Sequence, residues 1–146
     1  MKIQKAVKFQ KIDHVGIAVK DLNSAITKYE KLGFKLVSRE VIAKQEVEVA
    51  MFAIGMSFIE LIASTKEGSV IDRFIKKNNG NGGIQQLAIT VSDINSELER
   101  LKQEGIRLIN QQAVDGAHGT KVAFIHPKDT EGVLLELCEH QQSERK

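Results

Sequence analysis

Two glutamates lie in stretches whose other residues are almost all apolar. Glu60 is the centre of the string FIELI and Glu136 is the centre of LLELC. We expect both strings to be strands, at about 57–63 and 132–139, in which the glutamates are flanked by apolar residues on both sides. A carboxylate that is buried unpaired in such a strand costs several kcal/mol or becomes protonated. A bound divalent cation removes that cost, so the two glutamates are candidate metal ligands.

His14 and Gln86 form a second pair of polar side chains in predicted strands. Each lies in an alternating segment, 12–19 or 84–91, where side chains two positions further along the same face are small. Small neighbours leave a concave space beside these two residues. Imidazole or amide donors combined with two carboxylates suit zinc, cobalt, manganese, nickel or iron. We therefore predict a site for one divalent metal with ligands His14, Glu60, Gln86 and Glu136.

The four candidate ligands fall at equivalent positions of an internal repeat. Residues 12–37 align with 84–109 without a gap, and eight aligned positions are identical. VAMF and FIEL in the first repeat then match VAFI and LLEL in the second. A lone histidine or glutamate in a strand is more often structural or solvated than a ligand. Because a duplicated sheet with a pseudo-twofold axis brings equivalent positions together, the repeat favours a shared metal site, with a metal-free polar cavity as the alternative.

Each repeat predicts the element order βαβββ. The strand 12–19 or 84–91 is followed by a helix that begins at Asp21 or Asp93 and ends near Gly33 or Gly105. Three further strands are predicted in each repeat, at about 34–41, 45–54 and 57–63, and at about 106–111, 120–126 and 132–139.

These elements predict a single α+β domain over residues 1–146. Module 1 covers about 9–64 and module 2 about 84–140. A linking helix at 69–78 joins them, with Ser69 and Asp72 resembling a capping box at its start. The paired modules predict a mixed sheet that surrounds the metal.

Composition limits the other classes of function. The chain has 146 residues and a net charge of +2, which does not indicate a nucleic-acid surface. We find no signal peptide and no apolar stretch of membrane-spanning length. Cys138 is the single cysteine, so it cannot form an internal disulfide. These features predict a cytoplasmic protein without nucleic-acid or membrane partners.

Several longer strings resemble the vicinal oxygen chelate superfamily, which includes glyoxalase I and bleomycin-resistance proteins. They are IDHVGIAVKDL, GGIQQLAITVSDI and HGTKVAFIHPKDTEGVLLELCE, together with FIELI. Within the superfamily they are most similar to methylmalonyl-CoA epimerases, over about residues 9–140. The resemblance implies paired βαβββ modules that curl into a half-barrel around a divalent metal. It implies ligands at His14, Glu60, position 86 and Glu136, the same positions that the strand patterns select.

The resemblance also implies an activity. An epimerase of the methylmalonyl-CoA type removes the α-proton of a thioester through a metal-stabilised enolate. We expect Glu136 to be one catalytic base and Glu60 the second, with Glu48 a weaker candidate. The epimerase pattern has histidine at position 86, where this chain has Gln86. Glutamine is a ligand elsewhere in the superfamily, including glyoxalase I.

Because of Gln86, two functions other than the epimerase remain possible. One is a lyase of the glyoxalase I type, and the other is a non-catalytic protein that binds a drug or metabolite without metal. The epimerase interpretation implies an acyl-CoA substrate, for whose phosphates Lys121, Lys128 and the Lys76–Lys77 pair are candidates by charge alone. The superfamily often pairs modules between chains, which implies a homodimer. We assign no ligand role to the remaining histidines, which are His118, His126 and His140.

Overall fold

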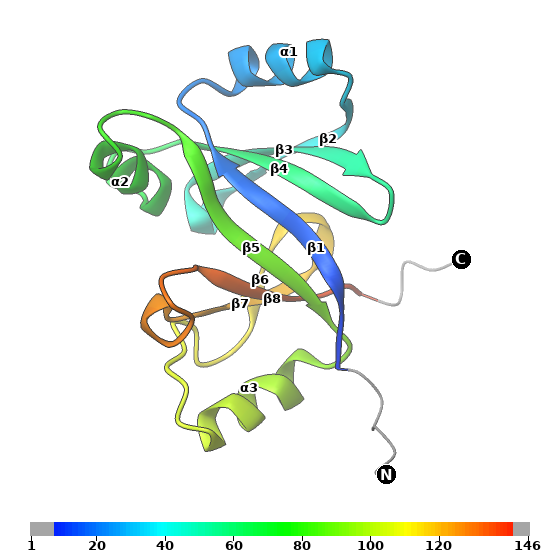
Figure 1. Ribbon diagram of the computed structural model, residues 1–146, viewed down its shortest axis with the longest axis vertical. Coiled ribbons are helices and arrows are strands. Elements are labelled where there is room, and N and C mark those ends of the chain that lie inside the picture. Colours follow the sequence, from blue (N-terminus) through cyan, green and yellow to red (C-terminus); the bar gives the residue numbers. More distant parts are fainter. Residues whose placement is uncertain (1–7, 142–146) are drawn as a thin grey trace. The chain divides into compact units, whose positions relative to one another are not determined.

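The computed structural model describes residues 8–141, which pack into two compact units (Figure 1). His14–Gln86 form the N-terminal unit, and residues 8–13 and 87–141 form the C-terminal unit. The strand β1 (Phe9–Ala18) passes from the C-terminal to the N-terminal unit after Asp13, and β5 (Gly83–Val91) passes back after Gln86. Each unit therefore contains residues from both sequence repeats.

The N-terminal unit has a mixed sheet with the strand order β2-β3-β4-β1. β1 pairs with β4 in parallel, whereas β2, β3 and β4 form an antiparallel meander. After β1, its elements are α1 (Leu22–Leu32), β2 (Lys35–Ile42), the 3-10 turn η1 (Ala43–Gln45), β3 (Val47–Ile54), β4 (Ser57–Ser64) and α2 (Val70–Lys77).

The C-terminal unit repeats this topology with shorter strands. Its strand order is β5-β8-β7-β6, with β5 parallel to β8 and the other pairs antiparallel. After β5, its elements are α3 (Ile94–Gln103), β6 (Val114–Asp115), η2 (Ala117–Gly119), β7 (Lys121–Ile125), η3 (Pro127–Asp129) and β8 (Leu135–Glu139). The two βαβββ modules and their mixed pairing confirm the predicted α+β fold class.

One predicted strand of the second repeat is wrong. Residues 106–111 form no continuous strand, and only an isolated bridge joins Leu108 to Ile125 of β7. The side-chain oxygen of Asn110 accepts the bond from the Phe124 N–H at 2.8 Å, in place of a backbone carbonyl. The Arg107 N–H donates to the Asp129 carboxylate at 2.7 Å. Because side chains take these bonds, regular pairing with β7 is restricted to the short strand β6.

The helix ends agree with the predicted signals in both repeats. The Asp21 carboxylate accepts from the Ser24 N–H, and the Asp93 carboxylate accepts from the Ser96 N–H. Each aspartate thereby satisfies one N–H that the first turn of the helix leaves unpaired. Gly33 and Gly105 follow the two helices at φ 111° and 80°, in the region that favours glycine.

The apolar faces of the two long helices pack on the sheets of their own units. Ile17 and Val19 of β1 contact the same cluster as the buried helix residues Leu22 and Ile26. Ile89 and Val91 of β5 lie in the corresponding cluster with Ile94 and Leu98. This alternation leaves His14, Gly16, Gln86 and Ala88 on the opposite face of their strands, as the sequence predicts.

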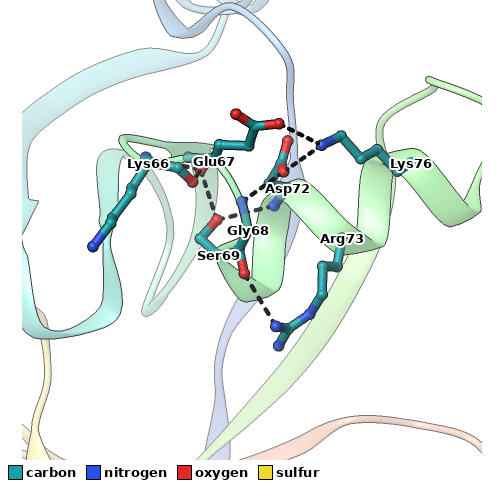
Figure 2. Close-up of polar contacts among 8 residues, drawn as sticks. Lys66, Glu67, Gly68, Ser69, Asp72, Arg73 and Lys76 are labelled. Atoms are coloured by element: carbon teal, nitrogen blue, oxygen red, sulfur yellow. Dashed lines mark hydrogen bonds and ion pairs between the residues drawn. The ribbon is translucent and has the colours of Figure 1, made fainter.

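Figure 2 shows the start of α2, where a network of side chains and backbone groups fixes the helix end. The Ser69 hydroxyl accepts from the Asp72 N–H at 3.0 Å, and the Asp72 carboxylate accepts from the Gly68 N–H at 2.8 Å. The Gly68 bond and the Lys76 ammonium, 3.0 Å away, lower the pKa of Asp72. Among residues 8–141, no helix is long and apolar enough to cross a membrane.

Candidate metal and active site

His14, Glu60 and Gln86 come together in the N-terminal unit. His14 is on β1, Glu60 is on the neighbouring strand β4, and Gln86 is on β5. The Nε2 atom of His14 is 3.4 Å from Oε1 of Glu60 and 3.4 Å from Nε2 of Gln86. The three residues are only 5–8% exposed. Residues that are far apart in the sequence therefore form one buried polar group.

Gly16 makes the space that Gln86 occupies. Gly16 lies two residues after His14 on β1 and is opposite Glu60 in the parallel pairing with β4. A Cβ atom on residue 16 would lie 2.5 Å from Cγ and 3.0 Å from Cδ of Gln86. Since real Cβ atoms essentially never approach so closely, any larger residue would force Gln86 to move. Gly16 therefore positions the Gln86 amide beside His14.

The donor atoms of this group fit one divalent cation. Donors bound at about 2.0–2.2 Å to the same ion lie about 3–3.6 Å apart, the range in which the two 3.4 Å separations fall. Rotation of the Gln86 amide by half a turn would present its oxygen, the atom that binds cations. A cation would also offset the cost of burying the Glu60 carboxylate. Imidazole, carboxylate and amide donors suit zinc and the neighbouring transition metals.

Glu136, the fourth predicted ligand, belongs to the C-terminal unit. It is on β8, is 5% exposed, and is opposite Ala88 of β5. Glu60 has the equivalent register in the N-terminal unit, opposite Gly16. The duplicated glutamates are thus both buried and occupy matching positions in their units. The role of Glu136 as ligand and base stays a prediction.

Glu48, the weaker candidate for a base, is part of a different polar group. Its Oε2 atom is 3.0 Å from Nη2 of Arg39, whose Nη1 donates to the Asn23 side chain on α1 at 2.9 Å. The Glu48 side chain is 31% exposed. Along β3, Glu48 alternates with Val47 and Val49 and shares the face of Ala50, which packs against α1. Glu48 therefore lies on the sheet face opposite that of Glu60.

The segment after β7 is stabilised by an ion pair. Arg107 donates to both carboxylate oxygens of Asp129, at 3.2 and 2.9 Å from Nε and Nη2. Together with the Arg107 N–H, this contact lowers the pKa of Asp129 to about 2. The His126 ring accepts from the Lys128 N–H at 3.1 Å and so caps η3. His126 thus has a local structural role in the described fold.

Two of the lysines proposed for CoA phosphates already face carboxylates. The ammonium of Lys121 is 2.6 Å from Asp115, and that of Lys76 contacts Asp72 and Glu67 at 3.0 and 3.6 Å. Lys77 and Lys128 are exposed. The charge of Lys121 and Lys76 is therefore partly neutralised within the chain, and phosphate binding would have to compete with these pairs.

A second polar group, which the sequence patterns did not select, lies in the C-terminal unit. The buried Asp13 carboxylate is 2.6 Å from Nε2 of His140 and accepts from the Thr90 hydroxyl at 2.9 Å. Cys138 Sγ is 4.0 Å from the same ring nitrogen. The spacing of Glu136, Cys138 and His140 is a signal for this group, since alternate residues of a strand share a face.

Comparisons with known proteins agree with this architecture. Residues 13–124 match the Glyoxalase/Bleomycin resistance protein/Dioxygenase superfamily, and the chain belongs to this family. A structure of methylmalonyl-CoA epimerase from Mycobacterium tuberculosis is 40% identical with a TM-score of 0.90, and the match covers 97% of this chain and 95% of that one.

Two further similarities concern relatives with stated substrates. The ethylmalonyl-CoA/methylmalonyl-CoA epimerase of Cereibacter sphaeroides is 37% identical over 87% of this chain and 96% of its own length. A methylmalonyl-CoA epimerase structure in complex with methylmalonyl-CoA and NH4+ is 31% identical with a TM-score of 0.87, over 92% of this chain and 96% of that one. These relatives support an epimerase-like isomerase as the class of enzyme.

Proposed function

We propose that the chain is a metal-dependent epimerase that inverts the α-carbon of methylmalonyl-CoA or a close acyl-CoA relative. The observation that carries the proposal is the buried group of His14, Glu60 and Gln86, in which His14 Nε2 lies 3.4 Å from Glu60 Oε1 and 3.4 Å from Gln86 Nε2. The similarity to acyl-CoA epimerases over most of the chain supports this substrate class. We propose Zn, Co, Mn, Ni or Fe as the metal, held by His14, Glu60, Gln86 and Glu136.

The reaction needs a base that takes the α-proton and an acid that returns one to the opposite face. A divalent cation bound at these residues would stabilise negative charge on the thioester and carboxylate oxygens of the substrate. We propose that the Glu136 carboxylate accepts the proton as the Cα–H bond breaks and its electron pair moves toward the thioester carbonyl. Glu60, in the equivalent register of the other unit, is the proposed acid: it enters this step protonated from solvent and donates that proton to the opposite face. Return of the electron pair to Cα then completes the inversion.

Burial of the polar group supports this chemistry. His14 and Glu60 are each 5% exposed, so little water would compete with the substrate oxygens for a cation held by these side chains. In this two-base scheme the proton that reaches carbon comes from Glu60 and not from Glu136, and the Glu60 proton exchanges with solvent between turnovers. Each turnover in D2O should therefore place deuterium at the α-carbon in the inverted product.

The experiment compares two substrates on the metal-free protein and on protein reloaded with each proposed metal. We expect a single epimer of methylmalonyl-CoA to exchange its α-proton for deuterium and to convert to a mixture of both epimers only after reloading. The hemithioacetal of methylglyoxal and glutathione should give no lactoylglutathione. Full epimerisation by the metal-free protein would contradict the metal dependence, and absence of exchange with every metal would contradict the epimerase assignment.

Gln86 favours one second candidate, a lyase of the glyoxalase I type. Such a lyase would use the same proton chemistry on the hemithioacetal. The variants Gln86→His and Gln86→Ala separate the candidates, because histidine restores the epimerase pattern while alanine removes the donor. An epimerase should keep its acyl-CoA turnover in Gln86→His and lose much of it in Gln86→Ala. Turnover of the hemithioacetal by the unmodified chain would instead establish the lyase.

A homodimer is also part of the proposal. Sedimentation equilibrium of the full chain, with and without the metal, measures the oligomeric state directly. A mass equal to one chain at all concentrations would contradict it.

A further inference from the structure

Three side chains of different chemistry converge in the C-terminal unit. A carboxylate oxygen of Asp13, the Cys138 sulfur and a ring nitrogen of His140 all lie within 4.8 Å of one another. Asp13 is on β1, Cys138 is on β8, and His140 directly follows the end of β8. Carboxylate, thiolate and imidazole are the three side-chain ligands that zinc uses in proteins.

The separations are close to those required around a tetrahedral ion. Oδ1 of Asp13 is 2.6 Å and Sγ of Cys138 is 4.0 Å from Nε2 of His140. Ligands at about 2.0–2.3 Å from one zinc ion lie roughly 3.3–3.6 Å apart, so each distance must change by less than about 1 Å. The His140 side chain is 46% exposed, and its ring can make this adjustment without repacking the core.

Burial and hydrogen bonding prepare the other two ligands. Asp13 is 2% and Cys138 is 1% exposed, whereas the exposed edge of His140 leaves a route from solvent. The Thr90 hydroxyl donates to Oδ1 of Asp13 at 2.9 Å and fixes the orientation of the carboxylate. A partner of this kind, bound to a ligand but not to the metal, is a regular part of protein metal sites. A cation here would offset the cost of burying Asp13 and would convert the thiol to a thiolate.

We propose that Asp13, Cys138 and His140 form a second divalent-metal site, which takes zinc and leaves one coordination position for water. This site shares no ligand with the proposed epimerase site, whose donors contain no sulfur. A thiolate ligand selects zinc over harder cations such as magnesium or calcium.

The site is confined to one half of the duplicated fold. The positions aligned with Asp13, Cys138 and His140 are Gln85, Ile62 and Ser64. Apolar Ile62 cannot bind a metal, and the remaining pair offers no thiolate or imidazole. Binding would join β1 to the end of β8 in the C-terminal unit and stabilise the folded protein by mass action.

Cobalt titration of the metal-free full chain tests the proposal. A cobalt ion bound to a thiolate gives a sulfur-to-cobalt charge-transfer band in the near ultraviolet, which oxygen and nitrogen ligands do not give. We expect this band in the unmodified protein and its absence in Cys138→Ser. His140→Ala should lose more affinity than the roughly 10–100-fold that follows from removing a residue that only hydrogen-bonds to a ligand. Zinc should remove the band and raise the Tm.

Two controls make the result specific. His118→Asn changes an exposed histidine of the same unit and should leave the band unchanged. His14→Ala should keep the charge-transfer band, although this variant loses a ligand of the proposed epimerase metal. The second metal site and the epimerase site can therefore be contradicted independently of each other. Absence of the band in the unmodified protein, or an unchanged affinity in His140→Ala, would overturn the second site whatever the epimerase assay shows.

Discussion

The two repeats place a buried glutamate in the same register but differ in the residue that it faces. Glu60 is opposite Gly16 in the N-terminal unit, and Glu136 is opposite Ala88 in the C-terminal unit. Glycine leaves room for the Gln86 side chain, which approaches the position of a residue-16 Cβ to 2.5 Å. Both repeats thus have the glutamate. They differ in one methyl group, because Gly16 beside Glu60 lacks the Cβ that Ala88 has beside Glu136.

The polar groups of the two units diverge further. The N-terminal unit gathers His14, Glu60 and Gln86, whereas the C-terminal unit gathers Asp13, Thr90 and His140 around one carboxylate. The two repeats have the same order and pairing of elements because each retains its apolar faces and helix caps. Side-chain chemistry was free to change where those requirements do not apply.

The strongest test of the comparison replaces the duplicated glutamates one at a time. We expect Glu136→Gln to reduce the kcat of epimerisation by about 10²–10⁴-fold, the usual contribution of a general base. Glu60→Gln should reduce kcat and also weaken metal binding, measured by calorimetry. Glu48→Gln is the matched control, because its carboxylate pairs with Arg39 on the face of α1. If Glu136→Gln retains activity within about twofold, its proposed role is wrong.

Exchange of the small residues opposite the glutamates tests the role of Gly16. Gly16→Ala should destabilise the protein by about 1–3 kcal/mol through overpacking, and should displace Gln86. Ala88→Gly should cost only about 0.5–1 kcal/mol, the usual effect of glycine within an element. Urea denaturation measures both values. Equal stability of Gly16→Ala and the unmodified protein would show that Gln86 does not need this space.

The helix caps should respond alike in the two repeats. Asp21→Ala and Asp93→Ala each remove an acceptor for a first-turn N–H, with an expected cost of about 1 kcal/mol. Asp21→Asn and Asp93→Asn should retain most of the stability because asparagine also caps helices. Thermal unfolding gives the comparison, and a large loss at only one cap would contradict their equivalence.

The smallest expected effect concerns the ion pair of the second repeat. The folded pKa of Asp129 is lowered from 3.8 to about 2, chiefly by the Arg107 hydrogen bond, so the pair stabilises the fold above pH 4. This contribution is lost as the pH falls from 4 through 2. The Tm difference between the unmodified protein and Asp129→Asn should therefore be full at pH 7 and shrink toward pH 2.

Asp115→Asn, at the exposed pair with Lys121, is the control for Asp129→Asn. It should have a smaller effect on the Tm at neutral pH, because exposed pairs of this kind contribute little. A Tm difference for Asp129→Asn that grows on acidification would contradict the sign of the pKa shift.

Helices, strand faces and the duplicated topology were predictable from the sequence, because each depends on local patterns. Asp21 and Asp93 marked helix starts, and alternation along β1 and β5 correctly separated the helix-facing side from the side of His14 and Gln86. The strand at 106–111 was not predictable in this way. Its apolar residues fit a strand, but the side chain of Asn110 within the segment and that of Asp129 outside it accept backbone N–H bonds that strand pairing would use.

The sequence by itself determined which residues are chemically unusual, since a carboxylate in an apolar strand requires compensation wherever the strand lies. Only the tertiary structure decided which of them meet. It brought Gln86 to His14 through the space left by Gly16, and it brought Asp13 to His140 across 127 positions of the chain. The physical reason is that side-chain type depends on one position, whereas a binding site depends on the pairing of distant strands.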